Sequence, residues 1–380
     1  MHLRAASVVG LAFLTPVILA ADPSATLKND ENSWPLFRGD GASRGVAACD
    51  LPSHPRILWQ FSIPNGAFES TPAVVQNTVL VTDLDGKLYA LDLLNGGKKW
   101  EYDSGSGFQA SPSVYQDRVV VGDIDGVVHC VALQDGRRLW TYTTEAEIDG
   151  SVNFYKDRLL VGSQDSTLYC LRVADGQLVW KFSIADQIRC TPTIIEGHAF
   201  VAGCDSRLHV LDVEQGRETA AVEIEAPTGV TPAAHENRVY FGTEGATFFC
   251  VDWRAAKVLW RYELPESGQS IRSCPALTET AVVFGGRDRR IHALDPATGR
   301  LLWTFATKAR VDASPVIVKD RVWVGASDGR LYALSLASGE LLWETELRGG
   351  INSGLAVAQR RLVVATDRGI VYCLGEAAPR

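Results

Sequence analysis

A tryptophan recurs along the chain at steps of about 40 residues, and this period constrains the fold more than any other feature of the sequence. The successive steps are 41, 40, 40, 80, 43 and 40 residues, and Ala220 occupies the expected position within the long step. The recurring residues are Trp59, Trp100, Trp140, Trp180, Trp260, Trp303 and Trp343. A period near 40 residues is typical of the blades of a β-propeller.

One repeat, from Trp303 to Trp343, contains four short apolar runs separated by turn signals. The runs cover residues 314–318, 322–325 and 331–334, and a fourth begins at Leu341. Short alternating runs closed by pairs such as Asp328-Gly329 predict antiparallel strands joined by tight hairpins. The runs are too short and too rich in β-branched residues for helical hairpins of similar period. Each repeat therefore predicts a four-stranded antiparallel blade.

The two ends of the chain predict how the ring closes. After Trp343, three runs predict strands but no fourth run follows: Ser353–Ala358, Leu362–Ala365 and Ile370–Leu374. Near the start, Arg56–Ile63 contains Trp59 and predicts a strand that has no blade of its own. Because an unpaired strand edge is unfavourable, we expect this strand to complete the last blade. The sequence thus predicts an all-β, eight-bladed propeller as a single domain over residues 56–380.

The N-terminus predicts export. Arg4 precedes an almost wholly apolar run from Ala5 to Ala20, and small residues stand before Asp22, so residues 1–21 are typical of a signal peptide cut after Ala20 or Ala21. The alternative is an uncleaved anchor helix, but the run is short for a span of about 20 residues. No cysteine lies near the cut, which argues against a lipoprotein. We expect a periplasmic or extracellular protein with an extension over residues 22–55 and no transmembrane segment in the mature chain.

Charge excludes one class of partner. The net charge of -8 argues against a nucleic-acid surface, and its main consequence is solubility. We expect a monomer.

The repeat resembles a known motif. Ser111-Pro112-Ser113-Val114, Val121-Gly122, Asp125-Gly126 and Trp140 match the repeat of pyrroloquinoline-quinone (PQQ) propellers, and Trp34-Pro35, Arg38-Gly39-Asp40 and Arg44 resemble the segment that precedes them. From Trp34 to its C-terminus the chain therefore resembles quinoprotein-type propellers, which include the outer-membrane assembly factor BamB family.

Three alternative functions follow, two from this resemblance and one, the receptor, from the arginines predicted at the channel. The first is an exported non-catalytic scaffold, similar to BamB, which presents channel and loop surfaces to a protein of the cell envelope and uses no cofactor. The second is a receptor for a sugar or an anionic small molecule in the channel. The third is a PQQ-dependent alcohol or sugar dehydrogenase with PQQ and calcium. The chain lacks the adjacent cysteine pair usual in those enzymes, so no catalytic residue is predicted.

Candidate binding residues lie where the blades differ from one another. The position two residues before each Ser-Pro-like pair begins the inner strand, so these side chains should surround the central channel. They are Glu69, Gln109, Asp149, Arg189, Gly229, Arg272, Asp312 and Asn352, with Phe68 beside Glu69. Unlike, polar side chains on a repetitive scaffold predict a binding site. The alternative is that the charges only pair with one another, Asp149 with Arg189 and Arg272 with Asp312, and plug the channel.

The cysteines and histidines predict no metal site. No zinc-like spacing occurs among the eight cysteines and seven histidines, and the Asp residues of the hairpins, such as Asp125, recur once per blade as turn residues. One disulfide is considered, between Cys190 and Cys204, because counting outward from the turn near Glu196-Gly197 sets Cys190 opposite residue 203 or 204. The alternative is that Cys190 only fills a position for a small residue.

Overall fold

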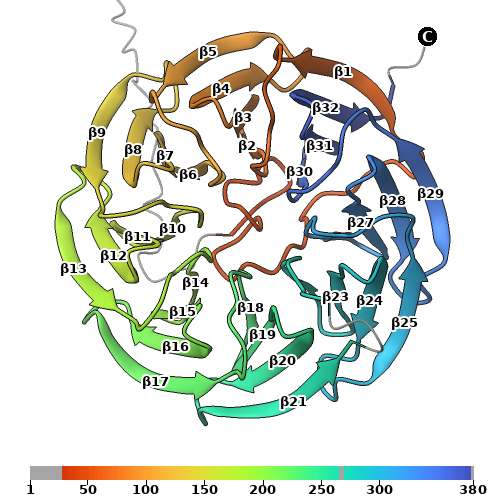
Figure 1. Cartoon of the computed structure of the whole chain (residues 1–380). Coiled ribbons are helices and arrows are strands. Elements are labelled where there is room, and N and C mark those ends of the chain that lie inside the picture. Colours follow the sequence, from red (N-terminus) through yellow and green to blue (C-terminus); the bar gives the residue numbers. More distant parts are fainter. Residues whose placement is uncertain (1–27, 265–268, 378–380) are drawn as a thin grey trace, which may run out of the picture.

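The protein is an eight-bladed β-propeller (Figure 1). The computed structural model describes residues 28–264 and 269–377, and in these residues 32 strands form eight sheets of four antiparallel strands each. No helix in this part of the chain is long and apolar enough to cross a membrane. The predicted signal peptide lies outside the described residues. The prediction of fold class is confirmed.

The blades follow one another around the ring, and each runs from an inner strand at the channel to an outer strand at the rim (Figure 1). Blade 1 comprises β2 (Ala73–Val75), β3 (Thr78–Thr82), β4 (Lys87–Asp92) and β5 (Lys98–Asp103), and blade 2 comprises β6 (Ser113–Tyr115), β7 (Arg118–Gly122), β8 (Val127–Ala132) and β9 (Arg138–Thr143). Blade 3 comprises β10 (Asn153–Tyr155), β11 (Arg158–Gly162), β12 (Thr167–Arg172) and β13 (Leu178–Ser183), and blade 4 comprises β14 (Thr193–Ile195), β15 (His198–Ala202), β16 (Arg207–Asp212) and β17 (Arg217–Glu223). Blades 5 to 8 comprise β18 (Ala233–His235), β19 (Arg238–Gly242), β20 (Thr247–Asp252), β21 (Lys257–Glu263); β22 (Ala276–Leu277), β23 (Val282–Gly285), β24 (Arg290–Leu294), β25 (Leu301–Ala306); β26 (Val316–Val318), β27 (Arg321–Gly325), β28 (Arg330–Ser335), β29 (Leu341–Glu346); and β30 (Ala356–Ala358), β31 (Arg361–Thr366), β32 (Ile370–Gly375) with β1 (Arg56–Ser62).

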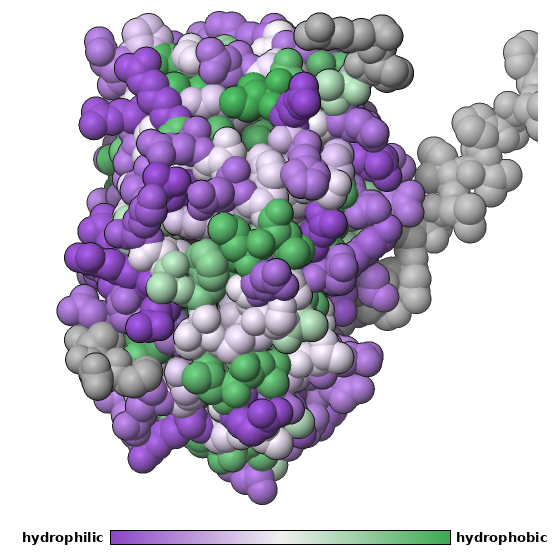
Figure 2. Space-filling model, turned by 90° about the vertical axis from the view of Figure 1, so that its right-hand side faces the viewer, coloured by the Kyte–Doolittle hydropathy of each residue, from purple (hydrophilic) through white to green (hydrophobic). Residues whose placement is uncertain are grey.

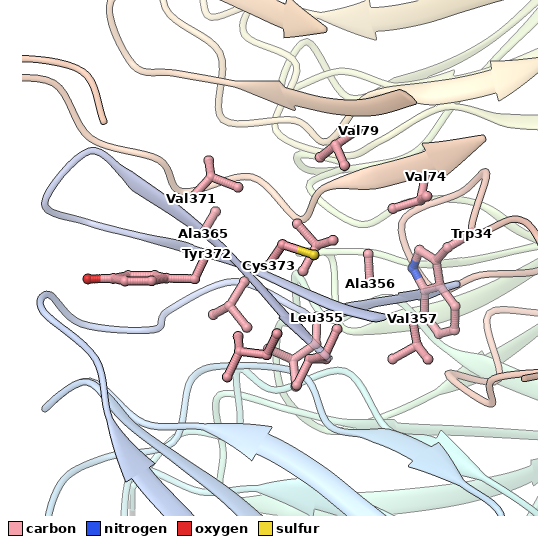
Figure 3. Close-up of a cluster of buried hydrophobic side chains, with 14 of the residues drawn as sticks. Trp34, Val74, Val79, Leu355, Ala356, Val357, Ala365, Val371, Tyr372 and Cys373 are labelled. Carbon is pink, nitrogen blue, oxygen red and sulfur yellow. The ribbon is translucent and has the colours of Figure 1, made fainter. Parts of the chain in front are cut away.

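The ring closes in blade 8, as the sequence predicted. β1 is the outer strand of this blade and pairs antiparallel with β32, from Arg56 opposite Gly375 to Ser62 opposite Ile370. Behind this pairing, a buried apolar cluster joins blade 8 to blade 1 and includes Trp34 from the N-terminal extension (Figure 3). The first and last strands of the propeller are thus held by hydrogen bonds on one side and by apolar packing on the other.

The inner strands are shorter than the sequence predicted. Residues 314–318 were expected to form one strand, but β26 begins only at Val316. The reason lies in the preceding serine, because Ser314 Oγ accepts a hydrogen bond from the backbone N–H of Cys274 in the neighbouring blade. The Ser-Pro pair therefore links blades and does not extend the ladder within its own blade.

The recurring tryptophans join each blade to the next. The indole Nε1–H of Trp59 donates to the carbonyl of Leu93 at 2.8 Å, and the same bond recurs from Trp100 to Leu133 at 3.1 Å. The Trp59 ring also lies against Gly96, whose φ is +74° and whose added Cβ would be 2.6 Å from the ring. Only glycine both adopts this positive φ readily and has no Cβ to collide with the ring. The recurring tryptophans therefore have a structural role at the contacts between blades.

Candidate functional site

A ring of hydrogen bonds surrounds the central channel. In each link, the N–H at the start of one inner strand donates to the side chain at the same position of the next blade, as from Thr71 to Ser111 Oγ (2.9 Å). The positions are Thr71, Ser111, Ser151, Thr191, Thr231, Cys274, Ser314 and Gly354. Gly354 has no side chain to accept a bond, although its own N–H donates to Thr71 Oγ1 at 2.7 Å. The Ser-Pro and Thr-Pro pairs of the repeat therefore hold the inner strands in a ring.

Residues 34–47, here named the N-terminal insert, cross the centre of the ring (Figure 1). Their carbonyl groups accept hydrogen bonds from the backbone N–H groups of six inner strands, and Asn153 Nδ2 adds a bond from blade 3 to the carbonyl of Gly41 (2.9 Å). The six donors are Val74, Val114, Ile194, Ala234, Leu277 and Ile317. The insert thus forms hydrogen bonds with the edges of inner strands, whose backbone groups would otherwise face the channel without partners.

Arg38 anchors the insert from within. Its side chain is 1% exposed, and its Nη2 donates to the carbonyls of Pro275 (3.1 Å) and Pro315 (2.5 Å) in blades 6 and 7. Burial lowers the pKa of Arg38 to about 10, while the charges of Cys274 and Asp40 oppose this shift. Gly45 makes room for the guanidinium, because its φ is +64° and an added Cβ would be 2.0 Å from Nη2.

Beside the insert lies a pocket of about 190 Å³, here named the channel pocket. It is lined by all eight of the ring positions singled out in the sequence, one from each blade, and Phe37 of the insert also lines it. Because the insert fills the channel at this point, the pocket is a recess in the propeller and not an open pore. The eight positions are Glu69, Gln109, Asp149, Arg189, Gly229, Arg272, Asp312 and Asn352.

The charged side chains pair only partly as expected. Asp149 Oδ2 accepts a hydrogen bond from Arg189 Nε at 3.1 Å. This pair was expected if the charges only pair with one another and plug the channel. Burial opposes protonation of this guanidinium, but the hydrogen bond and charge of Asp149 raise the pKa of Arg189 above its ordinary value.

The expected pair of Arg272 with Asp312 is wrong. Asp312 instead accepts two bonds from Arg287, both at 2.9 Å, and lies 3.1 Å from Arg310 Nε. Arg287 projects from the turn between β23 and β24, where its planar fork matches the carboxylate. Arg272 faces Glu244 at 3.7 Å without a hydrogen bond.

The sequence analysis did not identify the residues that contact the channel positions, because they lie in a second set of variable positions. Gln164, Glu244, Arg287 and Asp367 all belong to the turns between the second and third strands of their blades. The equivalent residues in other blades are Leu84, Ile124, Cys204 and Ser327. This variation is a signal in the sequence that could have identified a second tier of side chains at the channel.

Phe68 does not line the channel pocket. It is 1% exposed and packs edge-on against Tyr89, with ring centroids 6.1 Å apart. Because successive side chains of an extended segment point to opposite sides, Glu69 faces the channel while Phe68 enters the core between blades 8 and 1. The expectation that Phe68 belongs to the binding site is therefore corrected.

The disulfide between Cys190 and Cys204 is absent, and both residues are free thiols. The ladder between β14 and β15 ends at Thr193 opposite Phe200, so the two strands separate before Cys190 is reached. The backbone N–H of Cys204 donates to Gln187, and its thiol contacts the carbonyl of Thr228 at 3.8 Å. Burial raises the pKa of Cys190 to about 12, so this thiol is protonated at neutral pH.

The histidines of the third strands have structural partners. His129 Nε2 lies 2.8 Å from Asp123 Oδ2, and His209 and His292 make the same contact with Asp205 and Asp288 at 2.9 Å. Tyr89 and Tyr169 of the third strands likewise donate to Asp83 at 2.9 Å and to Asp165 at 2.7 Å. In these five blades, an Asp from one of two positions in the turn therefore orients the ring of the third strand.

The channel residues do not fit PQQ with calcium. PQQ is a polycarboxylate, whereas the pocket already contains Glu69, Asp149 and Asp312, and Arg189 is engaged by one of them. Within residues 28–264 and 269–377, no three His, Cys, Asp or Glu side chains are arranged to hold a metal ion. The chain also has no adjacent pair of cysteines. No reaction step is therefore derived through this cofactor.

Comparisons with known structures agree with this fold. BamB from Moraxella catarrhalis aligns with a TM-score of 0.73 at 16% identity, covering 85% of this chain and 100% of that one. The quinohemoprotein alcohol dehydrogenase from Comamonas testosteroni aligns with a TM-score of 0.78 at 14% identity, covering 92% and 82%. The computationally designed Ika8 protein gives 0.76 at 19% identity, covering 84% and 100%. At these identities the likeness shows the fold alone.

The sequence itself gives the family. No curated protein sequence matches the chain. The sequence profile described as "Outer membrane protein assembly factor BamB" matches it in three overlapping stretches, residues 44–148, 124–219 and 205–350. These stretches run without interruption over most of the chain, and the protein therefore belongs to the family of propellers with PQQ-like repeats that this profile represents.

Proposed function

We propose that the protein is an exported, non-catalytic scaffold that binds a partner protein of the cell envelope. The observation that carries this proposal is an asymmetry of the outer wall. At the start of the outer strands, blades 1, 2 and 4 have charged residues, Lys98, Arg138 and Glu218. Large apolar residues that are 36–50% exposed stand there in blades 5 to 8, namely Val258, Leu259, Leu301, Leu341, Leu342 and Ile57, and also in blade 3, namely Leu178 and Val179.

Blades 5 to 8 thus present apolar side chains on one continuous arc of the rim, and blade 3 adds a separate pair beyond the charged residues of blade 4. The side view shows apolar patches on the wall, separated by polar surface (Figure 2). A repeating fold does not require this asymmetry, since charged residues occupy the same register in blades 1, 2 and 4. Recurring exposed apolar residues on one side of a monomer mark a protein interaction surface. The filled channel and the BamB-type sequence also support a scaffold.

Site-specific photocrosslinking tests the proposed surface. A photoreactive amino acid at Leu342 in blade 7 is matched by one at Lys99 in blade 1, which occupies the same register of the outer strand. In cells, we expect one discrete crosslinked protein from position 342 and none from position 99. Equal crosslinking from both positions, or none from either, would contradict the proposal.

The non-catalytic part of the proposal is tested separately. Purified protein is incubated with PQQ and calcium, and dye-linked oxidation of alcohols and sugars is followed. We expect no turnover above that of an Asp149→Asn variant, which loses a charge from the channel pocket but keeps the size of the side chain. Calcium-dependent turnover that this variant abolishes would identify a dehydrogenase.

A further inference from the structure

In the channel pocket, one acidic side chain has no partner and one arginine has only a long ion pair. Asp149 is engaged by Arg189, and Asp312 by Arg287 and Arg310. Glu69 makes no hydrogen bond or ion pair with any residue in the described part of the chain. Arg272 is 52% exposed, and its nearest carboxylate, on Glu244, is 3.7 Å away without a hydrogen bond. Glu69 therefore has an uncompensated charge, and the guanidinium of Arg272 has donors that no carboxylate accepts in the described part of the chain.

Beside Arg272, the pocket continues into a recess of about 260 Å³ whose lining includes Arg189, Gly229, Glu244 and Arg272. Gly229 stands between Arg189 and Arg272 in the order of the blades, and an added Cβ would be 3.2 Å from Arg189 Cβ. Arg189 donates only its Nε–H to a residue in the described ranges, so its terminal N–H groups remain available. Two guanidinium groups on either side of an open position suit a carboxylate, which accepts paired N–H donors.

Two oxygen atoms at the pocket need a hydrogen-bond donor, whereas the guanidinium groups need an acceptor. Asp149 Oδ1 and Asn352 Oδ1 are shielded from solvent and have no donor within residues 28–264 and 269–377. A buried acceptor without a donor costs about 1–3 kcal/mol, so a ligand or ordered water that donates to these atoms is stabilised. Beside the carboxylates of Asp149 and Glu69, the best donor is an ammonium group.

We propose that the channel pocket binds a small zwitterion, an amino acid or a dipeptide. Its carboxylate lies between Arg189 and Arg272 beside Gly229, and its ammonium group lies beside the carboxylate of Asp149 and faces Glu69. A zwitterion offers a carboxylate to the free donors of Arg189 and Arg272 and an ammonium group to Glu69, whereas a dianion leaves Glu69 opposed to like charge. The recess of about 260 Å³ is smaller than the pockets of roughly 300–1,000 Å³ that hold drug-sized ligands, which favours a compact ligand. This inference is independent of the proposed scaffold function.

Calorimetric titration of the full-length protein with three matched probes tests the proposal. Glycylglycine has both charged ends, N-acetylglycylglycine lacks the ammonium group, and glycylglycinamide lacks the carboxylate. Each charge-assisted contact is worth about 1.5–3 kcal/mol, so we expect each blocked probe to bind about tenfold more weakly or worse. Equal binding of all three probes, or no binding of glycylglycine at millimolar concentration, would overturn it.

Variants then locate the site. We expect Arg272→Gln and Glu69→Gln each to weaken glycylglycine binding about tenfold, and Gly229→Val to abolish it by filling the recess. Arg254→Gln is the matched control, because Arg254 is also exposed but pairs with Glu196 outside the pocket. Thermal unfolding confirms that the variants are folded. Unchanged affinity in folded Arg272→Gln and Glu69→Gln proteins would refute the assignment, even if the scaffold proposal holds.

Discussion

Arg38 shows how a single residue fixes the N-terminal insert in the channel. Its guanidinium is buried and bonds to carbonyls of blades 6 and 7, so it couples three separate segments of the chain. Because burial lowers the pKa of Arg38 to about 10, the side chain is still protonated at neutral pH. The unfolded chain has a higher pKa at this residue, so deprotonation stabilises the folded state only above about pH 10.

We expect Arg38→Ala to lower the free energy of unfolding by about 3 kcal/mol, because it removes a buried hydrogen-bonded cation and leaves two carbonyls without donors. Urea unfolding followed by tryptophan fluorescence measures the change. Between pH 6 and 9 the loss should be constant, since Arg38 is protonated in both states over this range. Arg254→Ala serves as the exposed control and should change stability by less than about 0.5 kcal/mol. A loss of similar size in both variants would contradict the anchoring role.

The cysteines allow a second prediction at the residue scale. Burial raises the pKa of Cys170, Cys190 and Cys373 to about 12, and these thiols are shielded as well as protonated. Cys204 is only half-buried. We therefore expect iodoacetamide at pH 8 to modify Cys204 first in the native protein, whereas all eight cysteines react in urea. Mass spectrometry of the digest locates the label, and rapid native labelling of Cys190 would contradict the packing described here.

At the scale of the strand, blade 4 replaces the recurring tryptophan in an unusual way. Its outer strand has Ala220 at this position, and the next blade has Trp253 where other blades have leucine, valine or proline. Trp253 packs on Phe200 of blade 4 at 5.4 Å between ring centroids, and its indole donates to Glu236. The large ring that joins blades 4 and 5 thus comes from blade 5 instead of blade 4.

A double-mutant cycle tests this exchange. Trp253→Leu should destabilise the protein by about 3 kcal/mol because it leaves a cavity, and Ala220→Trp should cost about 1–3 kcal/mol because two indoles then compete for one gap. The double variant should recover most of the loss, since it restores the arrangement found in the other blades. Additive losses in the urea unfolding free energies would show that the two positions do not share a space.

At the scale of the whole molecule, N-terminal truncations separate the contributions of the insert and of the closing strand. Deletion through Ser33 should have little effect, because the retained chain keeps the contacts of Trp34. Deletion through Asp50 removes Arg38 and the bonds to the inner strands, so a larger loss is expected. Deletion through Ile63 also removes β1 and exposes the edge of β32, and should cost the most. Thermal unfolding and analytical ultracentrifugation of the three truncated proteins give the order of their stabilities. Equal stability of the proteins truncated through Asp50 and through Ile63 would argue against closure by β1.

The sequence predicted the ring because its signal is repeated eight times, and the pairing of β1 with β32 follows from counting strands. The channel positions were also found, because Glu69, Arg189 and Arg272 differ where the blades otherwise agree. The partners of these residues could not be derived from the blade period. Asp312 has Arg272 in the neighbouring blade but pairs with Arg287 from a turn, and side-chain reach decides that choice. The path of the insert depends on long-range bonds to separate blades, which no local pattern encodes.

The pairing of β1 with β32 also determines when the ring can close during synthesis of the chain. The ribosome makes β1 roughly 300 residues before its partner, and at about 5–20 residues per second the delay is about 15–60 s. During this interval the insert has only some of the blades to bind, and β1 has no neighbour. A chain that stops after blade 7 has seven sheets and an open gap. The nascent protein is therefore open to proteases and to pairing with other chains until its last 25 or so residues emerge.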